Sequence, residues 1–246
     1  MKSLLLIFAH PDDETVFAGG VASRCLEEGG RVALCTATLG ERGKLGAPPR
    51  CEDADLARTR QDELVHAANL IGISMLRVLG YPDRGLQYAP AETIRRQLVE
   101  LIRSACPQVV ITFDPNGSNL HPDHIAISRF TSDAIAAAAD PRWFPDLAPA
   151  HQVSRLLWTP PVRFWEVLRR GDPVGESGVD FVVDVSAWKD RKAAALRAHR
   201  TQHLSLERIL LSKPDADRLL SVELFRQAWG PPTASRPTGD IFDGLQ

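Results

Sequence analysis

The chain alternates short apolar runs with longer segments of helical period, and this alternation constrains its fold more than any other feature. The first run, SLLLIFA at residues 3–9, is continuously apolar after Ser3, which is typical of a strand buried on both faces. Strand–helix alternation predicts an α/β protein, a three-layer Rossmann-like fold with a mostly parallel sheet and helices on both faces. The other runs that we expect to form strands are 31–38, 75–80, 108–114, 153–159 and 179–186.

Segments of helical period separate these runs and follow the last of them. We expect one domain over residues 1–230 and an irregular arm over 231–246, which packs on the surface or takes part in contacts of a homo-oligomer. The segments that we expect to form helices are 14–30, 54–72, 92–106, 121–139 and 189–202, with a short one at 223–229.

Charge and cysteine usage restrict the kind of partner. The net charge of −2 offers no basic field for nucleic acid or an anionic membrane surface, so we expect a small-molecule substrate. The four cysteines form no C-x-x-C pair, which indicates reduced thiols in a cytoplasmic protein. The apolar run at residues 3–9 is too short for a membrane helix and has no cleavage signal, so we expect neither a membrane anchor nor secretion.

Polar clusters follow four of the expected strands. They are HPDDE at 10–14, LGERG at 39–43, YPDRG at 81–85 and NLHPDH at 119–124. Ligands of parallel sheets bind beyond the carboxyl ends of the strands. The sequence therefore predicts that the four clusters lie along one rim and form an active site.

Two of these clusters carry histidine and carboxylate at metal-ligand spacing. His10 and Asp13 are three residues apart, and so are His121 and His124 at the start of another helix. Acidic residues in a first helical turn can be simple caps, but two such clusters on one rim supply ligands that suit zinc. A catalytic zinc site needs three protein ligands, so one imidazole and one carboxylate are left over for acid–base chemistry.

The motifs and their order resemble the LmbE-like or PIG-L deacetylase family. That family includes N-acetylglucosaminyl-phosphatidylinositol deacetylases and the bacterial mycothiol- and bacillithiol-pathway deacetylases. The resemblance rests on AHPDDE at 9–14, LGERGKLG at 39–46, RTRQDELVHAANLIG at 58–72, HPDH at 121–124 and KAAALRAHRTQ at 192–202, and so covers almost the whole chain.

The resemblance implies a ligand set and a general base. His10, Asp13 and His124 would ligate a divalent metal ion, zinc in the first place and Fe²⁺ as the alternative. Asp12 would be the general base that takes a proton from the metal-bound water. Amide hydrolysis also fits these side chains chemically, because zinc lowers the pKa of bound water to about 7 and imidazole can protonate a departing amine.

The resemblance also gives roles to the second motif. His121 would stabilise the oxyanion and protonate the leaving amine, and Asp123 would orient one of the flanking histidines or cap the helix. In the mycothiol branch a tyrosine stands where this chain has Asn119. This departure argues against a mycothiol-pathway substrate, and the expected lack of a membrane anchor argues against phosphatidylinositol.

Three further residues would line the substrate pocket by resemblance. Glu41, Arg60 and Asp83 would hydrogen-bond sugar hydroxyls. Arg60 could instead pair with an acid on its own helix, and Asp83 could be only a turn residue. His199 is expected to pack or to support the site and not to catalyse.

We therefore expect a zinc-dependent amidohydrolase of linear amides that deacetylates an N-acetylglucosamine-type sugar or glycoconjugate. The same site could hydrolyse a different small amide or ester. A receiver-like domain with magnesium at Asp12 and Asp13 leaves HPDH unexplained and lacks a well-placed lysine. A sugar-binding protein with an inactive site conflicts with the intact set of ligand residues.

Overall fold

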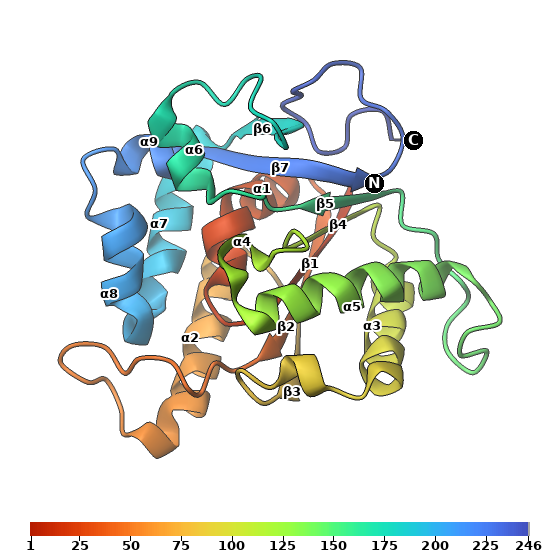
Figure 1. Cartoon of the computed structure of the whole chain (residues 1–246), viewed down its shortest axis with the longest axis horizontal. Helices are drawn as coiled ribbons and strands as arrows, with labels where there is room; N and C mark the ends of the chain where they lie inside the picture. The colour runs from red at the N-terminus through yellow and green to blue at the C-terminus, as the bar shows by residue number, and fades with distance from the viewer. Residues whose placement is uncertain (246) are drawn as a thin grey trace.

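The computed structural model describes residues 1–245 and contains a seven-stranded sheet of order β3-β2-β1-β4-β5-β7-β6 (Figure 1). Strands β1 to β5 pair in parallel, whereas β7 runs antiparallel to both β5 and β6. The strands are β1 (Ser3–Phe8), β2 (Arg31–Thr38), β3 (Met75–Tyr81), β4 (Val109–Thr112), β5 (Arg155–Trp158), β6 (Phe181–Asp184) and β7 (Val222–Trp229).

Helices cover both faces of this sheet, so the predicted three-layer α/β fold is confirmed. Helices α3 and α5 pack together on one face, and α1, α2 and α7 pack together on the other (Figure 1). None of the helices within residues 1–245 has the length and hydrophobicity needed to cross a membrane. The helices are α1 (Asp13–Glu27), α2 (Leu56–Ile71), α3 (Ala91–Ala105), α4 (Gly117–Leu120), α5 (Pro122–Ala139), α6 (Phe164–Arg170), α7 (Lys189–Ala198), α8 (His203–Leu206) and α9 (Ala216–Ser221).

Strand β1 occupies the middle of the parallel part of the sheet, between β2 and β4. All its residues are buried, as the continuous apolar run predicted. Phe8 at its carboxyl end packs edge-to-face on Phe113, which follows β4, with ring centroids 5.1 Å apart. This contact holds together the two strand ends from which the histidine motifs emerge.

The four polar clusters follow adjacent strands and contact one another at the carboxyl rim. The Asp83 backbone N–H, after β3, donates to Glu41 Oε1, after β2, at 2.8 Å. The Arg84 backbone N–H donates to Asp123 Oδ2, at the start of α5, at 2.6 Å. The structure therefore brings the segments after β2, β3 and β4 together.

One element was predicted wrongly. Residues 223–229 were expected to form a short helix, but they lie in β7, between β5 and β6 in the sheet. Their composition favours a helix only weakly, and the hydrogen bonds to two neighbouring strands override that preference. Helices α4, α6, α8 and α9 were not anticipated, because each is too short to show a helical period.

The segment expected as an irregular arm folds back over the antiparallel edge of the sheet. Its Thr238 carbonyl accepts from the Val182 N–H at 3.0 Å, and Ile241 is 3% exposed. The guanidinium of Arg155, on β5, is buried and donates to the Ile241 and Asp243 carbonyls at 2.6 and 2.7 Å. Residues 238–243 of this segment thus pack on the rest of the chain, whereas the domain boundary and a role of the arm in oligomer contacts stay predictions.

A buried ion pair joins α7 to β7 and α1. Lys192 Nζ lies 2.7 Å from Glu223 Oε1, and the two side chains are 0% and 1% exposed. The same carboxylate accepts the backbone N–H groups of Gly20 and Val21. We expect Lys192→Met to lower the free energy of unfolding by about 3–5 kcal/mol, because it leaves a buried carboxylate without its counter-charge. Urea denaturation measures this loss.

Lys189 on the same helix provides the matched control. It pairs with Asp217, and the two side chains are 34% and 77% exposed. Lys189→Met should cost at most about 1 kcal/mol, because exposed ion pairs are screened by water. Equal losses in the two variants would contradict a structural role for the buried pair.

Candidate active site

The first histidine motif forms the tight turn between β1 and α1. Asp13 Oδ2 accepts the His10 backbone N–H at 2.8 Å, which fixes the turn and keeps the two side chains adjacent. Asp12 between them has φ 111° and ψ −31°. A residue with a side chain in such a conformation is strained by about 1–3 kcal/mol, so the surrounding structure must hold Asp12 in place.

The second motif begins α5. His121 is the N-cap of this helix, and its Nδ1 accepts the Asp123 backbone N–H at 3.2 Å. Pro122 occupies the first helical position, where a missing N–H costs nothing. His124 lies in the first turn, and its ring stacks on Phe113 at 3.9 Å between centroids.

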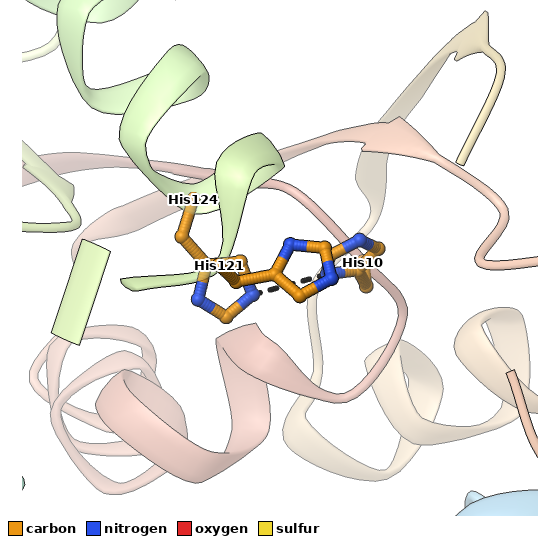
Figure 2. Close-up of side chains that lie close together, drawn as sticks. All are labelled: His10, His121 and His124. Atoms are coloured by element: carbon orange, nitrogen blue, oxygen red, sulfur yellow. Dashed lines mark hydrogen bonds between the residues drawn. The ribbon is translucent and has the colours of Figure 1, made fainter. Parts of the chain in front are cut away.

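The imidazole rings of the two motifs converge (Figure 2). The His121 ring centroid lies 4.7 Å from that of His10 and 4.9 Å from that of His124. His10 Nδ1 and His124 Nε2 are 3.1 Å apart. Two stretches that are distant in the sequence thus present ring nitrogens to the same small volume.

Three donor atoms in this volume have the spacing of metal ligands. His10 Nδ1 lies 3.4 Å from Asp13 Oδ2, and His124 Nε2 lies 3.5 Å from the same oxygen. With the 3.1 Å between the two nitrogens, they form a nearly regular triangle. Tetrahedral zinc, with bonds of about 2.0–2.2 Å, needs ligand atoms roughly 3.3–3.6 Å apart. The donor set therefore fits a divalent metal ion.

The hydrogen bonds of the rings leave a lone pair on the nitrogens of this triangle. His124 Nδ1 faces the Gly117 carbonyl at 3.1 Å and must donate to it, which leaves Nε2 as a base. His121 differs, because its Nδ1 already accepts the Asp123 N–H. In the neutral His121 ring the proton is then on Nε2, which makes this residue a hydrogen-bond donor and a poor ligand.

Two carboxylates lie within hydrogen-bonding distance of the other ring nitrogen of His10, Nε2. Its Nε2 lies 3.2 Å from Asp83 Oδ1 and 3.3 Å from Asp123 Oδ2. Burial lowers the pKa of His10, but hydrogen bonds to Asp123, Asp13 and Asp83 outweigh burial and raise this pKa well above its usual value. Carboxylates behind a ligating histidine are typical of metal sites, since they fix the ring and increase its basicity.

His10, with its raised pKa, must give up a proton to bind a cation, whereas the other two donors are already in the ionisation states that a metal requires. Burial lowers the pKa of His124 to about 4, so its ring is neutral near pH 7. Burial raises the pKa of Asp13, but the neighbouring His124 and His10 outweigh it and lower this pKa to about 2. A neutral imidazole and a carboxylate need lose no proton on binding a cation.

Asp12 sits beside this triangle with a carboxylate available to solvent. Its side chain is 19% exposed and makes no capping bond to α1 within the described chain. Burial raises the pKa of Asp12 to about 7, although Arg60 lowers it. Arg60 Nη2 lies 3.5 Å from Asp12 Oδ2. A carboxylate that titrates near neutrality matches the requirement for a general base.

The three residues expected to contact substrate lie close to these groups. Arg60 is 4% exposed and donates from Nη1 to the Gly40 carbonyl at 2.9 Å and from Nη2 to the Pro11 carbonyl at 2.5 Å. Asp83 is also 4% exposed, and its Oδ2 accepts the backbone N–H of Arg42 at 3.0 Å. In this structure Arg60 and Asp83 brace the rim loops, and their contact with a sugar stays a prediction.

Two further buried residues adjoin the site. Glu14 and His199 are both fully buried, and His199 Nε2 lies 3.1 Å from Glu14 Oε1. The sequence suggests only a cap for the acidic residues of the first motif and a supporting role for His199. The segment KAAALRAHRTQ, which carries part of the family resemblance, indicates that His199 lies near the site, but nothing in the sequence pairs His199 with Glu14.

Comparison with known proteins agrees with this geometry. The family model described as PIG-L, GlcNAc-PI de-N-acetylase, matches residues 5–135. The 1D-myo-inositol 2-acetamido-2-deoxy-alpha-D-glucopyranoside deacetylase of Geodermatophilus obscurus is 35% identical, over 99% of this chain and 98% of the relative.

Solved structures share the fold over nearly the whole chain. The conserved protein TT1542 of Thermus thermophilus has a TM-score of 0.71 and 26% identity, over 96% of this chain and 100% of that one. The N,N'-diacetylchitobiose deacetylase of Pyrococcus horikoshii has a TM-score of 0.71, covers 92% of this chain and 83% of its own, and at 23% identity supports the fold alone. The family match and the 35% identical relative show that the chain is an amidohydrolase and belongs to the PIG-L family of de-N-acetylases.

Proposed function

We propose that this enzyme is a zinc-dependent hydrolase that removes the acetyl group from the nitrogen of an N-acetylglucosamine-type sugar or glycoconjugate. The observation that carries the proposal is the triangle of His10 Nδ1, Asp13 Oδ2 and His124 Nε2, with sides of 3.1, 3.4 and 3.5 Å. These residues would hold the metal. When bound, zinc supplies Lewis acidity, which lowers the pKa of water and polarises an amide carbonyl.

Asp12 would act as the general base. Its carboxylate is partly exposed beside the triangle, and burial raises its pKa to about 7. It can therefore accept a proton from the attacking water at neutral pH. Arg60, 3.5 Å away, would keep one carboxylate oxygen in a fixed direction. The second oxygen is then left to accept the proton.

His121 would act opposite Asp12 as the hydrogen-bond donor and acid. With Nδ1 accepting the Asp123 N–H, Nε2 of the neutral ring carries a proton that can be donated in a hydrogen bond to the oxyanion. To protonate the leaving nitrogen, the ring would first have to take up a second proton at Nδ1 and give up its hydrogen bond to Asp123. The Asp123 carboxylate accepts from the backbone N–H groups of Arg84 and Leu86 and faces His10 Nε2. Asp123 would thus orient His10 through its side chain and His121 through its backbone.

The substrate class follows from the relatives. Several relatives at 31–35% identity are named 1D-myo-inositol 2-acetamido-2-deoxy-alpha-D-glucopyranoside deacetylases. This supports an N-acetylated glucosamine as the reacting part of the substrate. Asn119, which stands where the mycothiol branch has tyrosine, is exposed, and its Oδ1 accepts the His121 N–H at 3.0 Å. Asn119 thus shapes the turn before α5. Activity on a panel of sugars with different aglycones would show whether Asn119 also affects which substrate is preferred.

The cellular setting completes the proposal. All four cysteines are free thiols, namely Cys25, Cys35, Cys51 and Cys106. Free thiols are typical of proteins in a reducing compartment, which supports a cytoplasmic enzyme. A homo-oligomer stays a prediction.

A substrate panel tests the proposal. We expect the protein to release free amine from N-acetylglucosamine derivatives, including the α-linked inositol glycoside, and to lose this activity on chelation. Zn²⁺ or Fe²⁺ added back to the chelated protein identifies the metal that restores it. Acetate release from simple amides or esters alone, without amine release from any sugar, would favour the alternative function. Activity that survives complete removal of metal would contradict metal-dependent hydrolysis.

A further inference from the structure

The strained backbone of Asp12 is held by a side chain to which the proposed mechanism gives no role. The Asp12 N–H points to Glu14 Oε2, two residues later, at a distance of 3.1 Å. The Asp12 carbonyl accepts from Thr15 and Val16 in the first turn of α1. In an ordinary helix start the side chain at this position would cap the helix, but here the carboxylate of Asp12 makes no capping bond and Glu14 accepts the Asp12 N–H instead.

Glu14 is itself fixed by two donors. His199, at the end of α7, places Nε2 3.1 Å from Glu14 Oε1, and the Thr15 hydroxyl donates to the same oxygen at 2.6 Å. Both Glu14 and His199 are 0% exposed. His199 Nδ1 has no hydrogen-bond partner among residues 1–245, so the polar contact of this ring is made through Glu14.

We propose that His199 and Glu14 are positioning residues that hold Asp12 in its strained conformation and so aim its carboxylate at the reacting water. The inference rests on the proposed function, in which Asp12 is the base. It assigns a task to a residue 187 positions further along the chain (199 minus 12), at the C-cap of α7, a helix that contains none of the proposed metal ligands.

Two restraints on opposite sides of Asp12 support this assignment. Arg60 contacts the Asp12 carboxylate and the Pro11 carbonyl, whereas the His199–Glu14 pair restrains the Asp12 N–H. Without the pair, the peptide before Asp12 loses the bond that favours a positive φ. The side chain would then rotate away from its working direction while the metal ligands His10 and Asp13 keep their own mutual bond.

Three substitutions separate positioning from packing. His199→Phe keeps the ring volume and removes the donor, and Glu14→Gln removes the charge that accepts from both partners. His199→Gln restores an N–H donor to Glu14. His151→Phe is the matched control, because His151 is a half-buried histidine bound to the Pro107 carbonyl at 2.8 Å, near the amino end of β4 and away from the rim.

We expect His199→Phe and Glu14→Gln to lower kcat by about tenfold to a hundredfold, with KM and metal content unchanged. His199→Gln should recover most of this loss, and His151→Phe should leave kcat intact. A fall in metal content that accounts for the whole loss of kcat, or full activity in both His199→Phe and Glu14→Gln, would overturn the proposal.

An NMR measurement on the metal-free protein makes the test independent of activity. The Asp12 amide proton, bonded to a buried carboxylate, should move upfield and exchange faster in His199→Phe, and return in His199→Gln. An unchanged Asp12 amide would overturn the positioning role even if activity fell. If the unmodified protein deacetylates no sugar in the panel, the proposed function fails, and the NMR result still decides whether the pair holds Asp12.

Discussion

Asp12→Asn is expected to lower kcat by about a hundredfold to ten-thousandfold while the protein keeps its metal, because the change removes a general base and no ligand. The asparagine side chain has nearly the same shape, and its amide cannot accept a proton from water at neutral pH. Burial raises the pKa of Asp12 to about 7, so the native carboxylate can both accept and release that proton. Steady-state kinetics on an N-acetylated sugar, with metal analysis of the same sample, measure the effect.

Asp62→Asn controls for the loss of one negative charge. Asp62 is exposed on α2, two residues from Arg60 in the sequence, and should tolerate the change with full activity. Unchanged turnover in Asp12→Asn would remove Asp12 from the mechanism. Loss of metal in Asp12→Asn would instead make Asp12 a ligand.

His124→Ala is expected to lose the metal and with it the activity. Its Nε2 is one corner of the donor triangle, and two remaining ligands hold a divalent ion poorly. Metal content after dialysis, measured by plasma mass spectrometry, should fall from about one ion per chain, the number that a three-ligand site implies, to well below it. Full zinc occupancy would show that the ligand set is wrong.

Two histidine controls sharpen this test. His121→Ala should keep the metal and lose activity, because His121 Nδ1 is engaged by the Asp123 N–H and the ring acts as a donor. His66→Ala, on the exposed face of α2, should change neither. Loss of metal in His121→Ala would move His121 into the ligand set.

Much of the fold could be predicted because its central strands are buried on both faces. A continuous apolar run such as 3–9 is accommodated best as a strand covered on both faces, and the helices between such runs favour parallel pairing. β7 could not be predicted in the same way. It runs antiparallel between two strands, its neighbour β6 comes earlier in the chain, and its residues carry a mixed burial pattern that resembles a helix face.

The meeting of the two histidine motifs could also be anticipated. Both follow adjacent parallel strands, so the carboxyl-end rule brings them to one rim, and the structure places His10 Nδ1 3.1 Å from His124 Nε2. Spacing cannot show which way a side chain points. Asp83 was expected to hydrogen-bond a sugar, which stays a prediction, but its spacing in the sequence gave no sign that one of its oxygens lies 3.2 Å from His10 Nε2.

The contact between Glu14 and His199 was beyond the reach of sequence patterns. The two residues are 185 positions apart, and the contact depends on how α7 packs against α1. No periodicity encodes such packing. The role of this contact follows only from the structure, in which the Asp12 N–H of the strained turn is bonded to Glu14.

Anomalous diffraction at the zinc absorption edge, from crystals of the protein grown with zinc, tests the central claim most directly. The account predicts a single strong peak within bonding distance of His10 Nδ1, Asp13 Oδ2 and His124 Nε2, with His121 Nε2 outside the coordination sphere. A peak bound through His121 in place of one of these atoms, or no peak between the two motifs, would contradict it.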